Sequence, residues 1–293
     1  MNTKTITFSE VDPFLEWSEL VAKLVEGHKF PKAQINDTLI RRQDDTLLSR
    51  VAWIDGLGQL VKTATIFPKN YSTKKSIING AVSLFSDKTG ELEAFIDFHL
   101  LTKWKTAADS LLATKYLARK NSHNILLVGS GNMAEAMLDA YKSIFPRAAF
   151  FVWSRTPQNA ISFSEKHSIN LAKNLKLAVE SMDIICTATM STYPLIKGEW
   201  LQPGQHIDLI GAYRPDMREL DDSAIKAGKI FVDSYDTTID HIGELKTPLQ
   251  SGIIKNSDIL ADFYNLDKFK RSSPSDITTV SYTHLTLPTK RIV

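Results

Sequence analysis

The sequence predicts an α/β protein with two domains, and three observations carry this prediction. A glycine-rich turn at residues 129–134 stands between two apolar runs. Further apolar runs follow it at intervals that suit a doubly wound parallel sheet. The earlier residues instead hold β-like runs broken by Gly and Asn turns, which predicts a second α/β domain before the doubly wound one.

The first domain is expected at residues 1–117. Its β-like runs cover 46–53, 59–66, 81–86 and 91–98. Residues 104–119 follow with apolar side chains on one helical face, so we expect a helix that leads into the second domain. We also expect residues 266–293 to complete the first domain.

Residues 125–153 have the order strand, glycine-rich turn, helix, strand. Glycines in such a turn let backbone N–H groups approach a pyrophosphate, and the start of the helix favours its negative charge. This order predicts a Rossmann domain at residues 118–265 that binds NAD(P). The turn residues expected to bind the cofactor are Gly129, Ser130, Gly131, Asn132 and Met133.

The residues after the second strand of this unit indicate which dinucleotide binds. NAD sites usually place Asp or Glu there to hold the ribose 2′-hydroxyl. This chain has Ser154, Arg155 and Thr156, which would accept a 2′-phosphate through charge-assisted hydrogen bonds. NADP(H) is therefore expected to be preferred, with NAD(H) possible. The alternative is that Arg155 is only a solvated loop residue.

Composition excludes several classes of function. The 293 residues carry a net charge of +2 without a long basic block, so we expect no nucleic-acid partner. No apolar stretch is long enough to span a membrane, and the N-terminus lacks an apolar signal segment. Cys186 is the one cysteine, so neither a disulfide framework nor a cysteine-rich metal site is expected. A cytoplasmic enzyme without a metal is the expectation.

Two lysines are candidates for substrate binding. Lys62 lies among small and apolar residues, where a buried ammonium needs an anionic partner or a lowered pKa. Lys105, with Thr106, begins the connecting helix, near where a cleft between the domains would lie. Two such cations could hold a carboxylate, each contact contributing roughly 1.5–3 kcal/mol. Arg50 is a third cation nearby. Alternatively, Lys62 points to solvent from an edge strand and Lys105 merely starts a helix.

A charged cluster at residues 214–219 follows the end of a predicted strand, where ligands bind in open α/β sheets. We expect Asp216 and Glu219 to take part in a salt-linked turn rather than in a ligand site.

Six motifs occur in an order typical of one family: residues 61–68 (VKTATIFP), 105–108 (KTAA), 128–134 (VGSGNMA), 153–156 (WSRT), 187–189 (TAT) and 211–221 (GAYRPDMRELD). Over residues 28–278 the chain resembles the ornithine cyclodeaminase/mu-crystallin family. The resemblance implies a homodimer whose first domain carries substrate binding and dimerisation. Family members include cyclodeaminases, alanine dehydrogenases, opine-type synthases and reductases of cyclic ketimines.

The resemblance also implies residue roles. Lys62 matches the family lysine that contacts the substrate, and Lys105 replaces the arginine that usually grips the substrate carboxylate. Lysine keeps the charge but lacks the bidentate fork. Arg50 could substitute for a further family arginine that has no clear match. The residues expected to line the nicotinamide side are Thr187, Ala188, Thr189, Ile210, Gly211 and Ala212.

Tyr213 separates the possible activities. Ornithine cyclodeaminases carry an aspartate there, which assists ring closure, whereas a phenol with an ordinary pKa of about 10 is not an anionic base near pH 7. We therefore expect an NAD(P)H-dependent reductase of a cyclic or small α-imino acid of the Δ1-pyrroline-2-carboxylate type. The alternatives are ornithine cyclodeamination, alanine-type dehydrogenation, and a crystallin-like protein that binds NADPH without turnover.

The tail at residues 279–293 departs from the family pattern, which continues there with a Phe-Lys-x-x-Gly stretch and a long helix. We expect this tail not to be native, in which case part of the first domain is missing.

Overall fold

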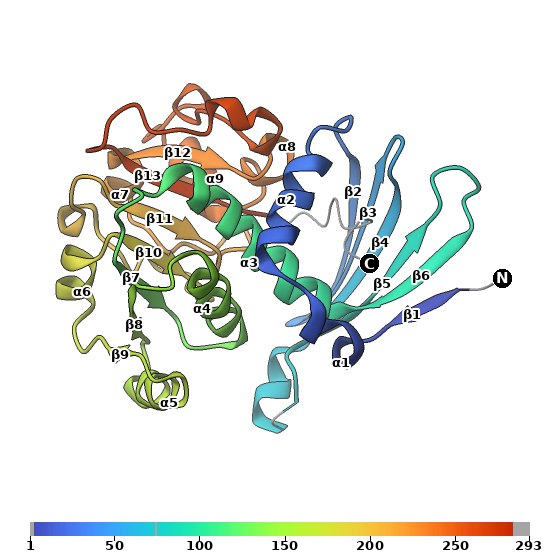
Figure 1. The fold of residues 1–293 in the computed structure, drawn as a ribbon, viewed down its shortest axis with the longest axis horizontal. Coiled ribbons are helices and arrows are strands. Elements are labelled where there is room, and N and C mark those ends of the chain that lie inside the picture. The colour runs from blue at the N-terminus through green and yellow to red at the C-terminus, as the bar shows by residue number, and fades with distance from the viewer. Residues whose placement is uncertain (1–2, 74, 284–293) are drawn as a thin grey trace. The chain divides into compact units, whose positions relative to one another are not determined.

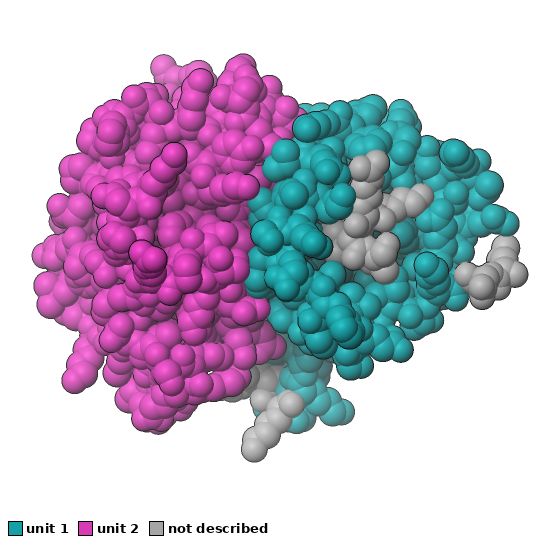
Figure 2. Space-filling view, in the orientation of Figure 1, with its two compact units in different colours: residues 1–105, 286–293 teal, residues 106–285 magenta. Residues whose placement is uncertain are grey.

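The computed structural model describes residues 3–73 and 75–283, which divide into two compact units (Figure 2). Unit 1 extends to Lys105, and unit 2 begins at Thr106. Both are α/β, as the sequence predicts, and each is described by itself.

Unit 1 contains a six-stranded sheet with the strand order β1-β6-β5-β4-β3-β2 (Figure 1). Strand β1 runs parallel to β6, and every other pair is antiparallel. Its elements are β1 (Lys4–Ile6), α1 (Phe8–Val11), η1 (Asp12–Phe14), α2 (Trp17–Gly27), β2 (Gln34–Arg42), β3 (Asp45–Ile54), β4 (Gly58–Ile66), η2 (Pro68–Thr73), β5 (Ile78–Phe85) and β6 (Leu92–Asp97).

The two faces of this sheet differ because side chains alternate along each strand. The cross-strand row Ala52, Leu60, Leu84 and Ala94 is buried on one face. On the other face, Val51 of β3 and Phe95 of β6 are exposed. One face of the sheet therefore forms the core of unit 1, and the other carries exposed apolar side chains.

Helix α3 (Phe98–Leu117) starts earlier than the sequence indicates. The Asp97 carboxylate accepts hydrogen bonds from the backbone N–H groups of His99 and Leu100 (2.8 and 2.9 Å), which satisfies two free donors of the first turn. In unit 1, Trp104 of this helix stacks on Trp17 of α2, with ring centroids 3.9 Å apart.

Unit 2 contains a seven-stranded parallel sheet with the order β12-β13-β11-β10-β7-β8-β9. From β9 to β11 this is the doubly wound order 3-2-1-4-5, so the predicted Rossmann fold is confirmed. Its elements are β7 (Asn124–Val128), α4 (Asn132–Ile144), β8 (Ala149–Trp153), α5 (Pro157–His167), β9 (Asn170–Leu171), α6 (Leu175–Ser181), β10 (Ile184–Thr187), η3 (Gly198–Trp200), β11 (His206–Leu209), α7 (Asp222–Ala227), β12 (Gly228–Val232), α8 (Tyr235–Thr238), α9 (Gly243–Gln250), η4 (Asn256–Asp258), η5 (Phe263–Lys268) and β13 (Ile277–Ser281).

Both faces of this sheet are covered, which is why its strands are continuous apolar runs. Helices α6 and α7 pack their buried alanines and aliphatic side chains on one face, against Leu126, Ile185 and Ile207. On the other face, the hydroxyl of Tyr141 from α4 donates a hydrogen bond to the buried carboxylate of Asp208 in β11.

The structure divides the chain differently from the domain bounds expected above. Residues 106–117 of α3 lie in unit 2, where Ser110 and Thr114 donate hydrogen bonds to Asp208 (2.9 and 2.7 Å). Strand β13 pairs with β11 and β12, so residues 266–283 also lie in unit 2 and do not complete unit 1. Of the atypical tail, residues 279–281 belong to β13 and residues 282–283 follow it, whereas residues 284–293 lie outside the described part of the chain.

Candidate functional site

The glycine-rich turn follows the central strand β7, where the strand order reverses. Gly129 has φ +122°, a conformation that residues with a side chain rarely adopt. A Cβ at this position would lie 2.6 Å from the carbonyl oxygen of Ala188, which follows the neighbouring strand β10. Both the backbone angle and this close approach therefore require glycine here.

Gly131 has a different environment. It is the N-cap of α4 with φ −93°, an ordinary extended conformation. A Cβ there would meet no described atom within 4 Å, so packing within the protein does not require glycine at this position. Asn132, the first residue of α4, is likewise exposed, whereas Met133 is half-buried and Ala134 is buried.

The loop after β8 contains the residues expected to determine whether NADP(H) or NAD(H) is preferred. Ser154 is half-buried, whereas Arg155 and Thr156 are exposed just before α5. Arg155 forms no ion pair with any residue that the structure describes, so its charge is available to an anion.

The loops after β10 and β11 are joined by one buried carboxylate, that of Glu219. Its Oε1 accepts hydrogen bonds from the N–H and hydroxyl of Thr189 (2.9 and 2.6 Å). Its Oε2 accepts from the hydroxyl of Thr187 and the N–H of Gly211 (2.6 and 2.9 Å). Of the residues expected on the nicotinamide side, the structure thus brings the 187–189 and 210–212 segments together. Thr187 itself is fully buried.

A second buried carboxylate, that of Glu244 at the start of α9, lies against Glu219. It accepts hydrogen bonds from the backbone N–H groups of Glu219 and Leu220 (2.6 and 2.9 Å). Burial, with the negative charge of Glu219 next to it, raises the pKa of Glu244 to about 8.

The environment of Glu219 differs from the expectation drawn from the sequence, which groups this residue with the charged turn. Arg214 and Asp216 do form the expected ion pair, through two hydrogen bonds of 2.9 and 2.8 Å. Glu219 is fully buried, and its carboxylate instead bonds to Thr187, Thr189 and Gly211. The signal in the sequence that could have indicated burial of Glu219 is its place between the apolar residues Met217 and Leu220, which are both buried.

In unit 1, Lys62 lies in β4 and is half-buried on the core face of the sheet. Its Nζ lies 4.8 Å from the centroid of the Phe98 ring, at the start of α3. Phe98 can approach the sheet because Gly80 of β5 has no side chain, since a Cβ there would be 2.4 Å from the ring. The structure therefore places Lys62 at the beginning of α3, in a central strand and not on an edge.

Arg50 lies directly opposite Lys62 on the neighbouring strand β3. Its guanidinium binds the carboxylate of Asp37 through two hydrogen bonds of 2.7 and 2.5 Å. The two cations therefore share one row of the sheet, and Asp37 offsets the charge of Arg50.

Lys105 and Thr106 are both buried in α3, with 3% of each residue exposed. Lys105 follows Phe98 by seven residues, which places the two on the same side of the helix, roughly 10 Å apart along its axis. Since Lys62 lies over Phe98, both candidate lysines are associated with this side of the first half of α3.

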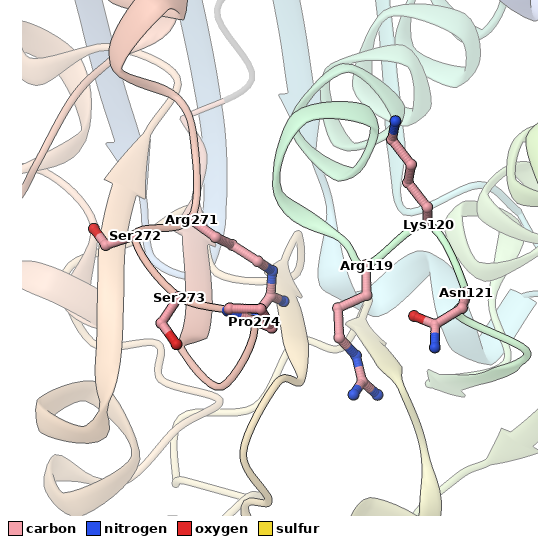
Figure 3. Close-up of a pocket in the computed structure, with 7 residues that line it drawn as sticks. All are labelled: Arg119, Lys120, Asn121, Arg271, Ser272, Ser273 and Pro274. Atoms are coloured by element: carbon pink, nitrogen blue, oxygen red, sulfur yellow. The ribbon is translucent and has the colours of Figure 1, made fainter.

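A pocket of about 360 Å³ lies at the opposite, amino-terminal edge of the unit 2 sheet (Figure 3). Its lining includes Arg119, which pairs with Asp183 at 2.5 Å, and Arg271, which donates hydrogen bonds to the backbone oxygens of Leu117, Asp276 and Gln205. Both guanidinium groups thus hold chain segments together. This pocket is separate from the glycine turn, which follows the carboxyl end of β7.

Within residues 3–73 and 75–283, no three His, Cys, Asp or Glu side chains are grouped so as to hold a metal ion. Over the same residues, no helix is both long and apolar enough to cross a membrane.

The doubly wound parallel sheet and the glycine turn at its switch point define an α/β protein with a Rossmann unit. The model of the ornithine cyclodeaminase/mu-crystallin family matches residues 55–279. The chain belongs to this family, and the resemblance inferred from the motifs is confirmed.

Known relatives and solved structures agree with this assignment. The chain is 39% identical to a Δ1-pyrroline-2-carboxylate reductase of Paracoccus denitrificans, over 93% of this chain and 89% of that protein. Its fold matches the Thermococcus litoralis Δ1-pyrroline-2-carboxylate reductase in complex with NADH and L-proline (TM-score 0.89, 26% identity, 97% of this chain and 93% of that one). It also matches an archaeal alanine dehydrogenase dimer with bound NAD (TM-score 0.88, 28% identity, 98% and 92%).

Proposed function

We propose that this chain is an NAD(P)H-dependent reductase of a cyclic or small α-imino acid, of the Δ1-pyrroline-2-carboxylate type. The observation that carries the proposal is the 39% identity to a reductase of that name over nearly the whole of both chains. The solved relative with NADH and L-proline supports the same substrate class, because proline is the product of such a reduction.

The residues of unit 2 fit a dinucleotide. The turn from Gly129 to Met133 would hold the pyrophosphate through the N–H groups at the start of α4, and Gly131 leaves the surface open to its approach. Thr187, Ala188, Thr189, Ile210, Gly211 and Ala212 would form the nicotinamide side, with the buried Thr187 acting through its neighbours. When bound, the cofactor supplies the hydride.

The residues of unit 1 supply charge for the substrate. Lys62 and Lys105, with Thr106 next in α3, would orient the substrate carboxylate, and Arg50 would add to the positive charge beside Lys62. Lys62 or a water molecule would give the proton that the imine nitrogen takes up. Tyr213 stands where cyclodeaminases need a carboxylate, and imine reduction does not need one there.

The test of this function is a spectroscopic assay with the purified chain. We expect oxidation of NADPH or NADH on addition of Δ1-pyrroline-2-carboxylate, with proline as the product. Formation of proline from ornithine without net use of cofactor would contradict the proposal and favour cyclodeamination. Ammonia-dependent reduction of pyruvate would favour an alanine-type dehydrogenase, and tight NADPH binding without turnover would favour a crystallin-like protein.

NADP(H) preference is proposed to depend on Arg155, which is exposed after β8 and has no ion-pair partner among the described residues. We expect Arg155→Ala to raise KM for NADPH at least about tenfold, which corresponds to the smallest free energy typical of one charge-assisted hydrogen bond. KM for NADH should change less than about twofold. Lys166→Ala is the matched control, because this exposed lysine of α5 pairs with Glu135 (2.9 Å). Equal effects of Arg155→Ala on both cofactors would contradict the assignment.

We further propose a homodimer formed through the exposed face of the unit 1 sheet. Val51, Val61, Ser83 and Phe95 lie in one row across β3, β4, β5 and β6, and Val51 and Phe95 are 42% and 46% exposed. An apolar sheet face of this kind favours a protein partner. The archaeal alanine dehydrogenase relative is a dimer, which supports a second copy of this chain as the partner.

The dimer proposal predicts that Val51→Glu converts the chain to a monomer, because each interface would bury two new carboxylates. Light scattering after size-exclusion chromatography measures this. Phe14→Glu is the control, since Phe14 in η1 is apolar and 81% exposed but lies outside the sheet. A Val51→Glu protein that stays dimeric would place the interface elsewhere.

A cytoplasmic location stays a prediction from the sequence.

A further inference from the structure

We propose that Glu219 is a positioning residue: its carboxylate joins the loops that follow β10 and β11 and thereby fixes the surface on which the nicotinamide ring is placed. This inference rests on the proposed function, since it concerns the same cofactor site. Glu219 is fully buried, so it acts through the loops and not by contact with the cofactor.

The number of hydrogen bonds is the first argument. A carboxylate offers about four acceptor positions, and Glu219 receives four donors, two from Thr189, one from Thr187 and one from Gly211. Two of these donors are backbone N–H groups, on the loops after β10 and β11 respectively. A glutamine has one oxygen and could not satisfy both loops at once.

The close approach of the two loops is the second argument. A Cβ at Gly211 would lie 2.0 Å from the carbonyl oxygen of Thr189, so the backbones are nearly in contact. On the other side, a Cβ at Gly129 of the glycine turn would lie 2.6 Å from the backbone oxygen of Ala188. The segment 187–189 is thus held between the glycine turn and the loop after β11. The buried carboxylate of Glu219 fixes the position of this segment through its hydrogen bonds.

Glu219 is itself held firmly. Its backbone oxygen accepts hydrogen bonds from Leu195 and Ile196 (2.8 and 3.0 Å), and its backbone N–H donates to Glu244 (2.6 Å). Burial of a carboxylate is unfavourable unless its hydrogen bonds compensate. The chain nevertheless places one here, at the carboxyl ends of the strands where ligands bind. This placement is better explained by an orienting role than by stability alone.

The test compares two ligands of the wild-type chain and of Glu219→Gln. NADH contains the nicotinamide, and ADP-ribose retains the pyrophosphate without it. We expect Glu219→Gln to raise Kd for NADH about tenfold, to change Kd for ADP-ribose less than about twofold, and to lower kcat. Thr187→Val is a milder second variant, because Thr187 is buried and its hydroxyl donates to Glu219. We expect Thr187→Val to change Kd for NADH and Kd for ADP-ribose in the same directions as Glu219→Gln does, by smaller factors.

Asp183→Asn is the matched control. Asp183 accepts hydrogen bonds from Arg119, His123 and Asn124 at the amino ends of the strands, so it joins two segments of the same sheet far from the turn. We expect it to lower Tm while leaving the ratio of the two dissociation constants unchanged. The inference is overturned, and the proposed function is not, if the wild-type chain binds NADH but Glu219→Gln weakens the binding of NADH and ADP-ribose equally. The same conclusion follows if Glu219→Gln weakens the binding of neither ligand. If the wild-type chain does not bind NADH, the proposed function fails and the inference with it.

Discussion

Lys62→Met is expected to lower kcat/KM for Δ1-pyrroline-2-carboxylate by about 10³-fold. Loss of one charge-assisted contact to a carboxylate accounts for roughly 10- to 150-fold, and loss of a proton donor contributes the remainder. Methionine keeps a stem that can pack on Phe98, over which the Lys62 ammonium lies at 4.8 Å, so the sheet should be preserved. Steady-state kinetics at saturating cofactor, together with an NADH titration, measures the effect. Kd for NADH should not change, because Lys62 belongs to unit 1.

Lys69→Met provides the control for this substitution. Lys69 is exposed in η2, a few residues after β4, so the variant removes the same charge without touching the core face of the sheet. A loss of less than about fivefold in Lys62→Met would contradict the role of Lys62, and so would an equal loss in Lys69→Met. Thermal unfolding of both variants separates a lost contact from a misfolded sheet.

The sequence predicts the Rossmann unit well because its signals are local. The glycine turn, the flanking apolar runs and their spacing each follow from the backbone and from burial on both faces of the sheet. Gly129 illustrates this, since its positive φ and its approach to Ala188 require glycine. The family follows from several such motifs in order.

The parts that the sequence could not predict depend on contacts between distant segments. Strand β13 pairs between β11 and β12, and nothing in the run from 277 to 281 specifies that neighbour over another. Glu219 lies 30 residues from Thr189, and its charge indicated a surface turn, whereas the fold buries it. Arg50 similarly required the strand register to show that Asp37 lies beside it. In each case the environment of the residue depends on which distant segment packs beside it, and the local sequence does not specify that segment.

Gly129→Ala is expected to abolish measurable NADH binding and to lower the free energy of unfolding by about 2–4 kcal/mol. Alanine at φ +122° is strained, and its Cβ would stand 2.6 Å from the Ala188 backbone oxygen, which cannot move without shifting the loop after β10. Calorimetric titration with NADH and denaturant unfolding measure the two effects. Retention of wild-type stability would show that the loop after β10 can move aside.

Gly131→Ala separates cofactor binding from stability. Its Cβ would contact no described protein atom within 4 Å, and φ −93° suits alanine, so stability should change by less than about 0.5 kcal/mol. NADH affinity should still fall about tenfold or more, because the glycine turn needs close approach of its backbone to the pyrophosphate. Full NADH affinity in Gly131→Ala would mean that the pyrophosphate binds away from this turn. Since this variant is expected to fold, it tests the site even where Gly129→Ala does not fold.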